Sequence, residues 1–430
     1  MLSAEDNAAL TRVGPGTPLG RFFRRYWIPA AKLEEIAQPG GAPVRVGLLG
    51  ERLVAFRDPA GRPGLVGEFC PHRRASLFYA RNEPDGLRCL YHGWKLGCAG
   101  EVLETPAEPK GSRMAAMIRH PAYPVREAGG LLWTYMGPPT LEPPFPRFPW
   151  LDLPPGKLLV VKMYQDSNYL QGLEGDLDPA HPNYLHRDFR LEDAKSWAGA
   201  GWQSIANLMG DGTPVIHCEE TAYLMRVAAV RSTPDPKVNY VRTYEWVAPF
   251  YTYIPTGPHE SRLFKAWQPI DDERCFTFYI HYDPDKALDP QAIHANWGHR
   301  TEPPFYRTPH SLENAHLQDR ARMGGNFSGI EGAAIQDRAV QESMGPICDR
   351  TGEHLGVSDK AVVFFRRLIL KKLKEMDEGG RLPAQDPALD FRHRTASCHM
   401  PADVPWQEAL RYHEQLERES TPAARSATAP

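Results

Sequence analysis

Two short cysteine–histidine motifs constrain this chain more than any other feature of its sequence. The first, Cys-Pro-His, runs from Cys70 to His72, and the second, Cys-Leu-Tyr-His, runs from Cys89 to His92, with the sixteen residues 73–88 between them. Two thiolates and two imidazoles hold either one zinc ion or a two-iron cluster. Zinc fingers usually keep their cysteines in one pair and their histidines in the other, whereas each pair here supplies one of each. A cluster with two cysteines on one iron and two histidines on the other is therefore favoured, and zinc is the alternative.

The residues after each pair strengthen the iron interpretation. The whole pattern, Cys-Pro-His-Arg-Arg-Ala … Cys-Leu-Tyr-His-Gly-Trp, closely resembles the Rieske domain of ring-hydroxylating oxygenases. This resemblance implies a [2Fe–2S] cluster on Cys70, His72, Cys89 and His92. Rieske proteins of quinol-oxidising membrane complexes carry extra cysteines inside the two ligand loops, and the stretch between these ligand pairs has none. The oxygenase type is therefore favoured.

Composition sets wide bounds on the rest of the chain. Its 430 residues are long for one core and ample for two domains. The net charge of −3 gives no sign of a nucleic-acid or membrane-surface partner. No run approaches the roughly 18 apolar residues of a spanning helix, and the N-terminus lacks a basic-then-apolar signal segment. The seven cysteines are odd in number and scattered, as is usual in a reduced compartment, so we expect a cytoplasmic protein.

Local patterns predict a chain rich in loops and antiparallel strands. It contains 42 prolines and 36 glycines, residues that are typical of turns. Residues 4–12 predict a short helix, and residues 44–57 alternate around a Gly50-Glu51 turn as a β-hairpin does. Residues 358–376 predict an amphipathic helix with a structural role. Residues 143–155 hold too many prolines for a helix or a central strand, so we place a domain boundary there.

A second group of chemically informative residues lies at 168–186. Asp178-Pro179 resembles a helix N-cap followed by proline at the first helical position. On such a helix His181 and His186 share one face and can converge on one metal, with Asp178 beside His181. A histidine pair on a helix is more often structural, but a Rieske cluster delivers single electrons that a nearby iron uses. Two histidines and one carboxylate form the facial triad of non-haem Fe(II) oxygenases.

The third ligand of this triad comes from elsewhere in the chain. Residues 336–342, Gln-Asp-Arg-Ala-Val-Gln-Glu, resemble the late carboxylate motif of the phthalate and dicamba oxygenase branch. We therefore choose Asp337 as the third ligand. Its rivals are Glu342 and then Glu331 or Asp349, each of which is otherwise an exposed helix carboxylate.

An arginine between the two triad segments is a candidate substrate contact. The alternating strand pattern at 240–248 places Arg242 on one face with two aromatic residues. Arg242 is either a surface residue or a pocket residue that holds a substrate carboxylate through its bidentate guanidinium group. Arg226 and Arg231 are weaker candidates. Residues 187–203 are expected to form a mobile lid over the active site.

The resemblance to Rieske non-haem iron oxygenases extends from Gly14 to about Phe391. It is closest to the phthalate dioxygenase-like branch, whose oxygenases contain only α subunits, and rests further on the stretches that begin at Gly14, Asn168 and Met344. It implies an α+β fold in which an antiparallel β Rieske domain joins a helix-grip-like catalytic domain, an antiparallel sheet with covering helices. We expect an N-terminal strap packing on both domains at 1–40, a Rieske domain at 41–145, a catalytic domain at 146–415 and a disordered tail at 416–430.

The same resemblance also predicts assembly and electron supply. It implies a trimer or a pair of trimers, in which the Rieske domain of one subunit reduces the iron of its neighbour. In this arrangement Asp178 bridges a cluster-ligating histidine of one subunit, His92 in preference to His72, to His181 of the next, and it serves electron transfer rather than ligation. A separate flavin and iron–sulfur reductase is expected to supply electrons from NAD(P)H, because the chain has no Gly-x-Gly-x-x-Gly nucleotide site.

Branch membership also suggests the reaction. The expected function is a terminal oxygenase that uses O₂ to hydroxylate, by cis-dihydroxylation or monohydroxylation, an aromatic carboxylate of the phthalate or benzoate type, with Arg242 as its anchor. One alternative is oxidative O- or N-demethylation or ether cleavage within the same branch. The other is an electron carrier without catalysis, which a second domain of this length and a second iron site oppose.

Overall fold

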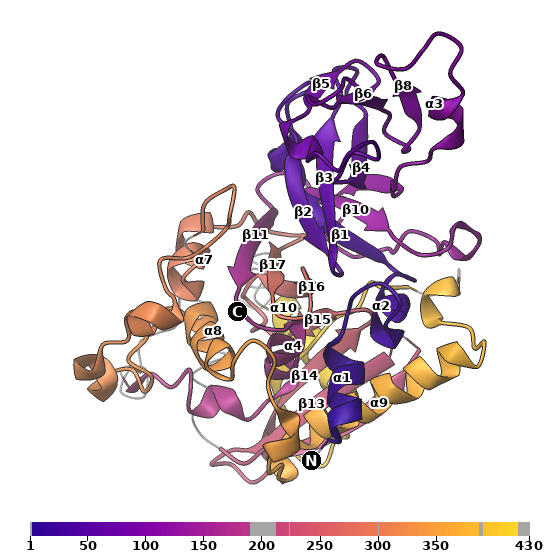
Figure 1. Cartoon of the computed structure of the whole chain (residues 1–430). Helices are drawn as coiled ribbons and strands as arrows, with labels where there is room; N and C mark the ends of the chain where they lie inside the picture. The colour runs from indigo at the N-terminus through magenta and orange to yellow at the C-terminus, as the bar shows by residue number, and fades with distance from the viewer. Residues whose placement is uncertain (1, 190–211, 223, 300, 387–389, 420–430) are drawn as a thin grey trace.

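The β-strands of the molecule fall into two groups that lie in different parts of the view (Figure 1). The structure, a computed structural model, describes residues 2–189, 212–222, 224–299, 301–386 and 390–419. Small sheets built from the first third of the chain lie in the upper part of the view, and a larger sheet with its helices fills the lower part. The two cysteine–histidine motifs belong to the upper part, and the His181 segment belongs to the lower part.

The upper part holds two antiparallel sheets that carry the cysteine–histidine motifs. The first sheet contains β2 (Val44–Leu48), β3 (Glu51–Arg57) and β4 (Pro63–Gly67). The second contains β5 (Arg81–Glu83), β6 (Gly86–Arg88), β7 (Lys95–Leu96) and β8 (Val102–Glu104), followed by the short helix α3 (Met114–Met117). The expected hairpin at 44–57 is confirmed, but its turn residues are Leu49 and Gly50, both with positive φ, and Glu51 already pairs with Leu48.

A third small sheet joins the N-terminal segment to the chain beyond the motifs. Its order is β1 (Trp27–Lys32), β10 (Leu131–Tyr135) and β9 (Val125–Ala128). The helices α1 (Ala4–Thr11) and α2 (Pro18–Phe23) precede β1, and α1 confirms the expected helix at 4–12. The Lys162 ammonium group also contacts the Glu35 carboxylate at 2.9 Å. The N-terminal segment is thereby tied to both halves of the molecule.

The lower part is built on an eight-stranded antiparallel sheet. Its order is β11-β17-β16-β15-β14-β13-β12, with one further strand, β18, paired to β14. The bounds are β11 (Leu158–Gln165), β12 (Val215–Thr221), β13 (Leu224–Ser232), β14 (Val238–Val247), β15 (Tyr251–Ile254), β16 (Arg262–Pro269), β17 (Cys275–Tyr282) and β18 (Ser397–Pro401). Residues 143–155, which lead into this sheet, form neither helix nor strand, as their prolines predict.

Helices cover the large sheet and position the candidate site. They are α4 (Tyr169–Leu177), α7 (Pro290–Trp297), α8 (Ala333–Ser343), α9 (Lys360–Asp377) and α10 (Ala409–Glu419). The amphipathic helix expected at 358–376 is confirmed as α9, whose buried residues Phe365, Leu368 and Ile369 join the main hydrophobic core. In the described part of the chain, no helix is both long and apolar enough to cross a membrane.

The expected start of the C-terminal tail needs correction. Residues 416–419 are helical and complete α10, so a disordered tail does not begin at 416. α10 packs on β18, and its Ala409 and His413 are buried, which explains why the helix continues to Glu419. Residues 420–430 lie outside the described part of the chain.

Candidate active site

The two cysteine–histidine loops fold in the same way. In each loop the cysteine N–H donates to the carbonyl five residues later, and the cysteine carbonyl accepts from the N–H four residues later, at 2.9–3.0 Å. The residue four positions after the cysteine has a positive φ in both loops, 61° at Arg74 and 72° at Gly93. Cys70 and Cys89 therefore occupy equivalent positions in two matching turns.

These turns bring cysteine to cysteine and histidine to histidine. Cys70 and Cys89 are both buried, and burial together with the neighbouring Cys89 thiol raises the pKa of Cys70 to about 11. The rings of His72 and His92 lie 4.5 Å apart between centroids. His72 also stacks on Trp94, and its buried Nδ1 atom has no hydrogen-bond partner. This is the arrangement that a [2Fe–2S] cluster with two cysteines on one iron and two histidines on the other requires.

A single zinc ion does not fit these four side chains. Bonds of about 2.0–2.3 Å to one tetrahedral ion would bring all four ligand atoms within roughly 4 Å of one another. Across the described residues, the one group of three or more potential ligands whose atoms lie within 4.8 Å of one another is His181, His186 and Asp337. The four cysteine and histidine side chains are therefore arranged for two metal ions rather than one.

The segment that carries the second histidine pair folds differently from its prediction. Asp178 does not begin a helix; it is the C-cap residue of α4, and its carboxylate accepts a hydrogen bond from the Ala180 N–H at 2.7 Å. Only one 3₁₀ turn, His181–Asn183, comes next. The expected N-cap at Asp178 is therefore wrong. Proline is tolerated at position 179, but Pro182 has no N–H to donate to the Asp178 carbonyl, which is the first hydrogen bond that a helix starting at Asp178 would need.

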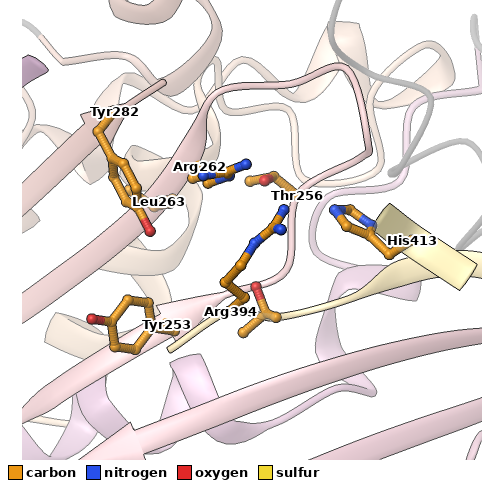
Figure 2. A pocket seen from close by; sticks show the side chains of 8 residues that line it. Tyr253, Thr256, Arg262, Leu263, Tyr282, Arg394 and His413 are labelled. Atoms are coloured by element: carbon orange, nitrogen blue, oxygen red, sulfur yellow. The ribbon is translucent and has the colours of Figure 1, made fainter. Parts of the chain in front are cut away.

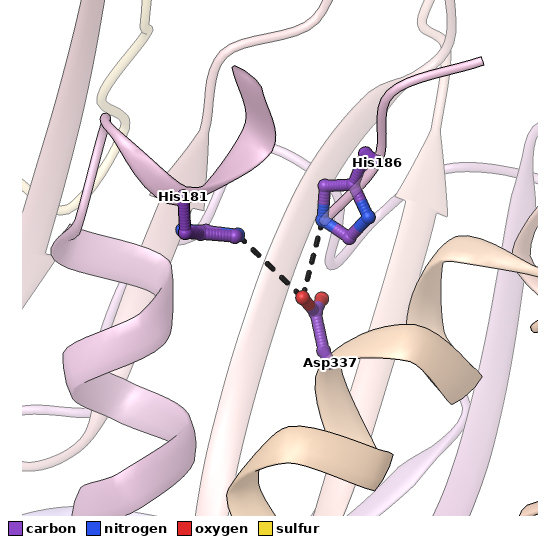
Figure 3. A group of neighbouring side chains, drawn as sticks. All are labelled: His181, His186 and Asp337. Atoms are coloured by element: carbon purple, nitrogen blue, oxygen red, sulfur yellow. Dashed lines mark ion pairs between the residues drawn. The ribbon is translucent and has the colours of Figure 1, made fainter. Parts of the chain in front are cut away.

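The turn nevertheless brings both histidines to one carboxylate (Figure 3). The Nε2 atoms of His181 and His186 lie 3.5 Å and 3.1 Å from the Oδ1 atom of Asp337, which projects from α8. The other nitrogen of each ring is already engaged: His181 Nδ1 contacts the main-chain carbonyl of Asp178 at 2.8 Å, and His186 Nδ1 contacts Gln336 Oε1 at 2.6 Å. Because both partners are acceptors, each Nδ1 donates to its partner, which leaves Nε2 as the ring nitrogen that faces the shared centre and that a metal ion there would bind.

The charges of this group suit a cation. Burial disfavours a charged imidazole, yet the contacts with Asp178 and Asp337 outweigh it and raise the pKa of His181 from 6.5 to about 10. Burial also opposes charge on Asp337, but His186 and His181 hold the pKa of its carboxyl group well below the usual value. A partly buried, ionised carboxylate beside two imidazoles matches the two-histidine, one-carboxylate ligand set of non-haem Fe(II).

The rival carboxylates are all engaged away from this group. Glu342 is buried and accepts from Arg338 Nε at 2.6 Å. Glu331 is exposed and pairs with Arg322 at 2.9 Å. Asp349 caps the short turn that begins after it. None of the three shares the centre that His181 and His186 face.

Of the three candidate arginines, one lines a cavity beside the triad and two do not. A cavity of about 630 Å³ opens beside the triad, and Arg242 lines it together with Tyr244. The surface interpretation of Arg242 is wrong, because its side chain is buried; one end donates to the Pro255 carbonyl, while Nε has no hydrogen-bond partner. Arg226 pairs with Glu245 instead, and Arg231 donates to the Pro179 carbonyl, so that it ties β13 to the turn that carries His181. Neither lines the cavity.

Other parts of the molecule contribute less to the site. Of the expected lid at 187–203, residues 190–203 lie outside the described part of the chain. A second hollow of about 10 Å³ lies where Arg394 and His413 approach Tyr253 and Arg262 (Figure 2). It has room for one water molecule and is too small for an organic ligand.

Sequence reasoning missed one clear contributor to the triad. Gln336 is buried, and it accepts from His186 through Oε1 while its Nε2 donates to the Ile330 carbonyl at 2.8 Å. Gln336 directly precedes Asp337 within the late carboxylate motif, so a signal was present in the sequence. Only the folded chain, however, shows that Gln336 faces a histidine 150 residues earlier.

Comparison with known proteins agrees with this geometry. The Rieske [2Fe-2S] domain family matches residues 26–124, and the family described as LigXa C-terminal domain like matches residues 134–422. The chain is 37% identical to the phthalate 4,5-dioxygenase oxygenase subunit of Pseudomonas putida over 95% of this chain and 94% of that protein. It is 34% identical to the 3-chlorobenzoate-3,4-dioxygenase oxygenase subunit of Comamonas testosteroni, over 97% and 99% of the two chains.

A third relative and two solved structures extend the comparison. The 5,5'-dehydrodivanillate O-demethylase oxygenase subunit of Sphingobium sp. is 34% identical over 91% of this chain and 85% of its own. The fold is similar to that of Pseudomonas putida CBB5 NdmA with caffeine, with a TM-score of 0.58, 20% identity and coverage of 90% and 99%. The fold is also similar to that of dicamba monooxygenase bound to 3,6-dichlorosalicylic acid, with a TM-score of 0.54 and 20% identity, over 83% of this chain and 99% of that one.

These matches settle the class of enzyme and its cofactors. The family uses a Rieske [2Fe–2S] cluster, a non-haem iron, O₂ and electrons from a separate component. An oxygenase-type second domain excludes the carrier-only alternative, and a [2Fe–2S] domain excludes structural zinc. The chain belongs to the Rieske non-haem iron oxygenases as an α subunit of the phthalate dioxygenase-like branch.

Proposed function

We propose that this terminal oxygenase hydroxylates an aromatic carboxylate of the phthalate or benzoate type, with electrons that a separate NAD(P)H-dependent reductase supplies. The observation that carries the proposal is Arg242, a buried cation in the wall of the triad cavity whose Nε atom has no partner. An arginine keeps its charge when buried and binds a carboxylate through two parallel hydrogen bonds. A substrate carboxylate would satisfy the free donor.

The names of two relatives support the same substrate class. One is a phthalate 4,5-dioxygenase subunit and the other a 3-chlorobenzoate-3,4-dioxygenase subunit, so both act on aromatic carboxylates. We therefore propose phthalate, benzoate and chlorobenzoates as the first compounds to test.

The seven cysteines, all in the described part of the chain, form no disulfide, and the cytoplasm remains the expected compartment.

We propose a role for each group of site residues in the chain. Cys70, His72, Cys89 and His92 would hold the cluster, and His181, His186 and Asp337 would hold the iron. Iron in such a site supplies the activation of O₂ at positions that the protein leaves open. The chain's residues orient the two histidine rings, keep Asp337 ionised and hold the substrate carboxylate at Arg242, so that the ring and not the acid group faces the triad.

Asp178 is proposed as the contact between subunits. Its carboxylate is one quarter exposed, and one oxygen lies 3.6 Å from His181 Nδ1. It can therefore meet a neighbouring Rieske domain on one side and the triad on the other. A trimer or a pair of trimers would supply that neighbour, and His92 is the preferred partner, ahead of His72.

The experiment that tests the function is oxygen uptake with identification of products. The protein, reconstituted with iron and a suitable reductase, is supplied with NADH and a panel of aromatic acids. We expect hydroxylated acids from the wild type. Arg242→Met removes the cation at similar length and should raise KM at least tenfold, since a hydrogen bond to a charged group is lost.

Controls separate binding from general damage. Arg242→Lys keeps the charge without the fork and should give an intermediate KM, while the visible spectrum of the cluster stays unchanged in both variants. Unchanged KM for every acid in Arg242→Met would show that the carboxylate is not bound there. Oxidation of neutral aromatic compounds only would contradict the proposed substrate class.

Oxidative O-demethylation is the second candidate. One relative favours it: the 5,5'-dehydrodivanillate O-demethylase oxygenase subunit, which is 34% identical and aligns over most of this chain. Removal of a methyl group by oxygen insertion releases formaldehyde, whereas ring hydroxylation does not. Formaldehyde assays on methoxybenzoates under the same conditions therefore distinguish the two reactions.

A further inference from the structure

Among the described residues, three side chains in the wall of the triad cavity have a buried polar atom without a hydrogen-bond partner, namely Arg242, Tyr244 and His281. His281 is the one that stands apart from the other two, on another strand. It lies on β17, lines the cavity and is 1% exposed, and its Nε2 atom has no hydrogen-bond partner. Buried polar side-chain atoms in proteins are nearly always paired, so such an atom beside a ligand cavity indicates a partner that arrives with the ligand. Neither ring hydroxylation nor demethylation, as proposed, uses this histidine.

The strand register shows that His281 and Arg242 stand on the same face of the sheet. His281 pairs with Leu263 on β16, and Leu263 pairs with Ile254 on β15. The pairing of β15 with β14 places Tyr244 opposite Ile254, one residue beyond the Glu245–Tyr253 pair. Directly paired residues point to the same face, as do residues two apart on one strand, so Tyr244 and Arg242 share the face of His281.

This register also sets the separation of the two groups. Three strand intervals lie between β14 and β17, and neighbouring strands are about 4.8 Å apart, so the two strand axes are roughly 14 Å apart across the cavity wall. A ligand held at both ends must therefore be extended, with its two polar groups at opposite ends of an aromatic body.

The surroundings of His281 decide which chemical group it prefers. Burial, with the nearby Lys265 and His294, lowers the pKa of His281 from 6.5 to about 3, so the ring is neutral near pH 7. Lys265 is itself neutralised by Asp176 at 2.6 Å. The ring packs against Trp297 and His299, which is also buried with a lowered pKa. A neutral imidazole offers one donor and one acceptor and no net charge.

We infer that His281 binds a neutral hydrogen-bonding substituent, a hydroxyl group above all, at the end of the aromatic substrate remote from its carboxylate. The inference rests on the proposed function for the position of the carboxylate at Arg242. It narrows the substrate class from aromatic acids in general to aromatic acids that carry a phenolic hydroxyl group away from the acid. A second carboxylate would not suit a neutral, buried ring.

Ligand binding to the iron-loaded protein tests this without turnover. Calorimetry under anaerobic conditions compares benzoate with 4-hydroxybenzoate, and biphenyl-4-carboxylate with 4'-hydroxybiphenyl-4-carboxylate. We expect the hydroxylated member of at least one pair to bind about tenfold more tightly, since its partner leaves the buried nitrogen unpaired. Salicylate is the matched control, because its hydroxyl group lies beside the carboxylate and should bring no such gain.

Two variants assign the effect to the histidine. His281→Leu should abolish the preference and leave the affinity for the parent acids unchanged, which also shows that the cavity is folded. His281→Gln retains a donor and an acceptor and should keep part of the preference. No preference in the wild type, or a preference that survives in His281→Leu, would overturn the inference while leaving carboxylate binding at Arg242 intact.

A neutral pair of ligands separates this inference from the proposed function. 4-Methylphenol and toluene differ by a hydroxyl group and carry no carboxylate. One outcome is that the acids fail to bind, while 4-methylphenol binds more tightly than toluene and His281→Leu removes this difference. In that case the proposed acid substrate class is wrong, but the role of His281 stands. If neither the acid pairs nor the neutral pair depends on His281, the inference falls.

Discussion

Gln336 fixes the orientation of one ligand of the proposed iron site. Its Oε1 atom accepts from His186 Nδ1, and its own amide group is held by the Ile330 carbonyl, so the amide cannot turn over without loss of both bonds. Side chains that hold a metal-binding histidine in this way typically contribute 10- to 100-fold to metal affinity. The residue acts through His186 and not on the substrate.

Replacement of Gln336 should therefore weaken iron binding selectively. We expect Gln336→Met to bind Fe(II) about 10- to 100-fold more weakly, measured by anaerobic titration, with the Rieske visible and EPR signals unchanged. Gln336→Glu keeps an acceptor oxygen and should retain most of the affinity. Equal loss of iron in both variants would indicate that the amide donor to Ile330, rather than the contact with His186, is what matters.

At the scale of helices and strands, the sequence patterns predicted the elements that depend only on residues close together in the chain. The hairpin at 44–57, the helix α1 and the amphipathic helix α9 arise from alternation, capping and periodicity within a few residues. The helix expected from Asp178 was wrong, because Asp178 ends α4 and Pro182 cannot make the first hydrogen bond of a helix that would start there, so only a single turn follows. The residue types of the candidate site were readable from motifs, whereas the contacts of Gln336 and His281 depend on pairings between distant strands and helices that no local pattern encodes.

The packing of α4 on the sheet gives a prediction at this scale. Glycine to alanine in a helix usually stabilises by about 0.5–1 kcal/mol. A Cβ at Gly172, however, would lie 2.1 Å from the ring of Trp267, which is fixed by a hydrogen bond to Asp176. We expect Gly172→Ala to destabilise the protein by about 1–3 kcal/mol, because the ring cannot move away.

Thermal or urea unfolding followed by tryptophan fluorescence measures this change. The matched control is Gly175→Ala on the same helix, where the added Cβ meets only the amide end of Gln341 at 2.8 Å. Gln341 is held there by a hydrogen bond that its Oε1 accepts from Gln165 Nε2 at 2.9 Å, but a linear side chain can adjust more than an indole ring, so the control should cost less than Gly172→Ala. Equal or higher stability of Gly172→Ala would show that the helix and Trp267 separate easily.

At the scale of the whole molecule, the two candidate metal centres lie in different parts of one chain (Figure 1). Asp178 is the proposed contact with a neighbouring subunit. Its backbone carbonyl, not its carboxylate, makes the close hydrogen bond to His181. We expect Asp178→Asn to keep full iron and sulfide content and to lose at least 90% of turnover, and metal analysis beside oxygen uptake checks both. Loss of the mononuclear iron would instead make Asp178 a ligand.

Mixed assemblies test whether electrons cross between subunits. One chain carries Cys70→Ser, which removes a proposed cluster ligand, and the other carries Asp337→Ala, which removes a proposed iron ligand. Each variant alone should be inactive. The two are co-expressed with different tags, and assemblies that hold both are purified through both tags in turn.

Because no chain in these assemblies has both centres intact, turnover requires the cluster of one subunit to serve the iron of another. We therefore expect the doubly tagged assemblies to regain measurable product formation. If they stay inactive while wild-type chains carrying the same two tags are active, electron transfer runs within a single chain and Asp178 has no bridging role.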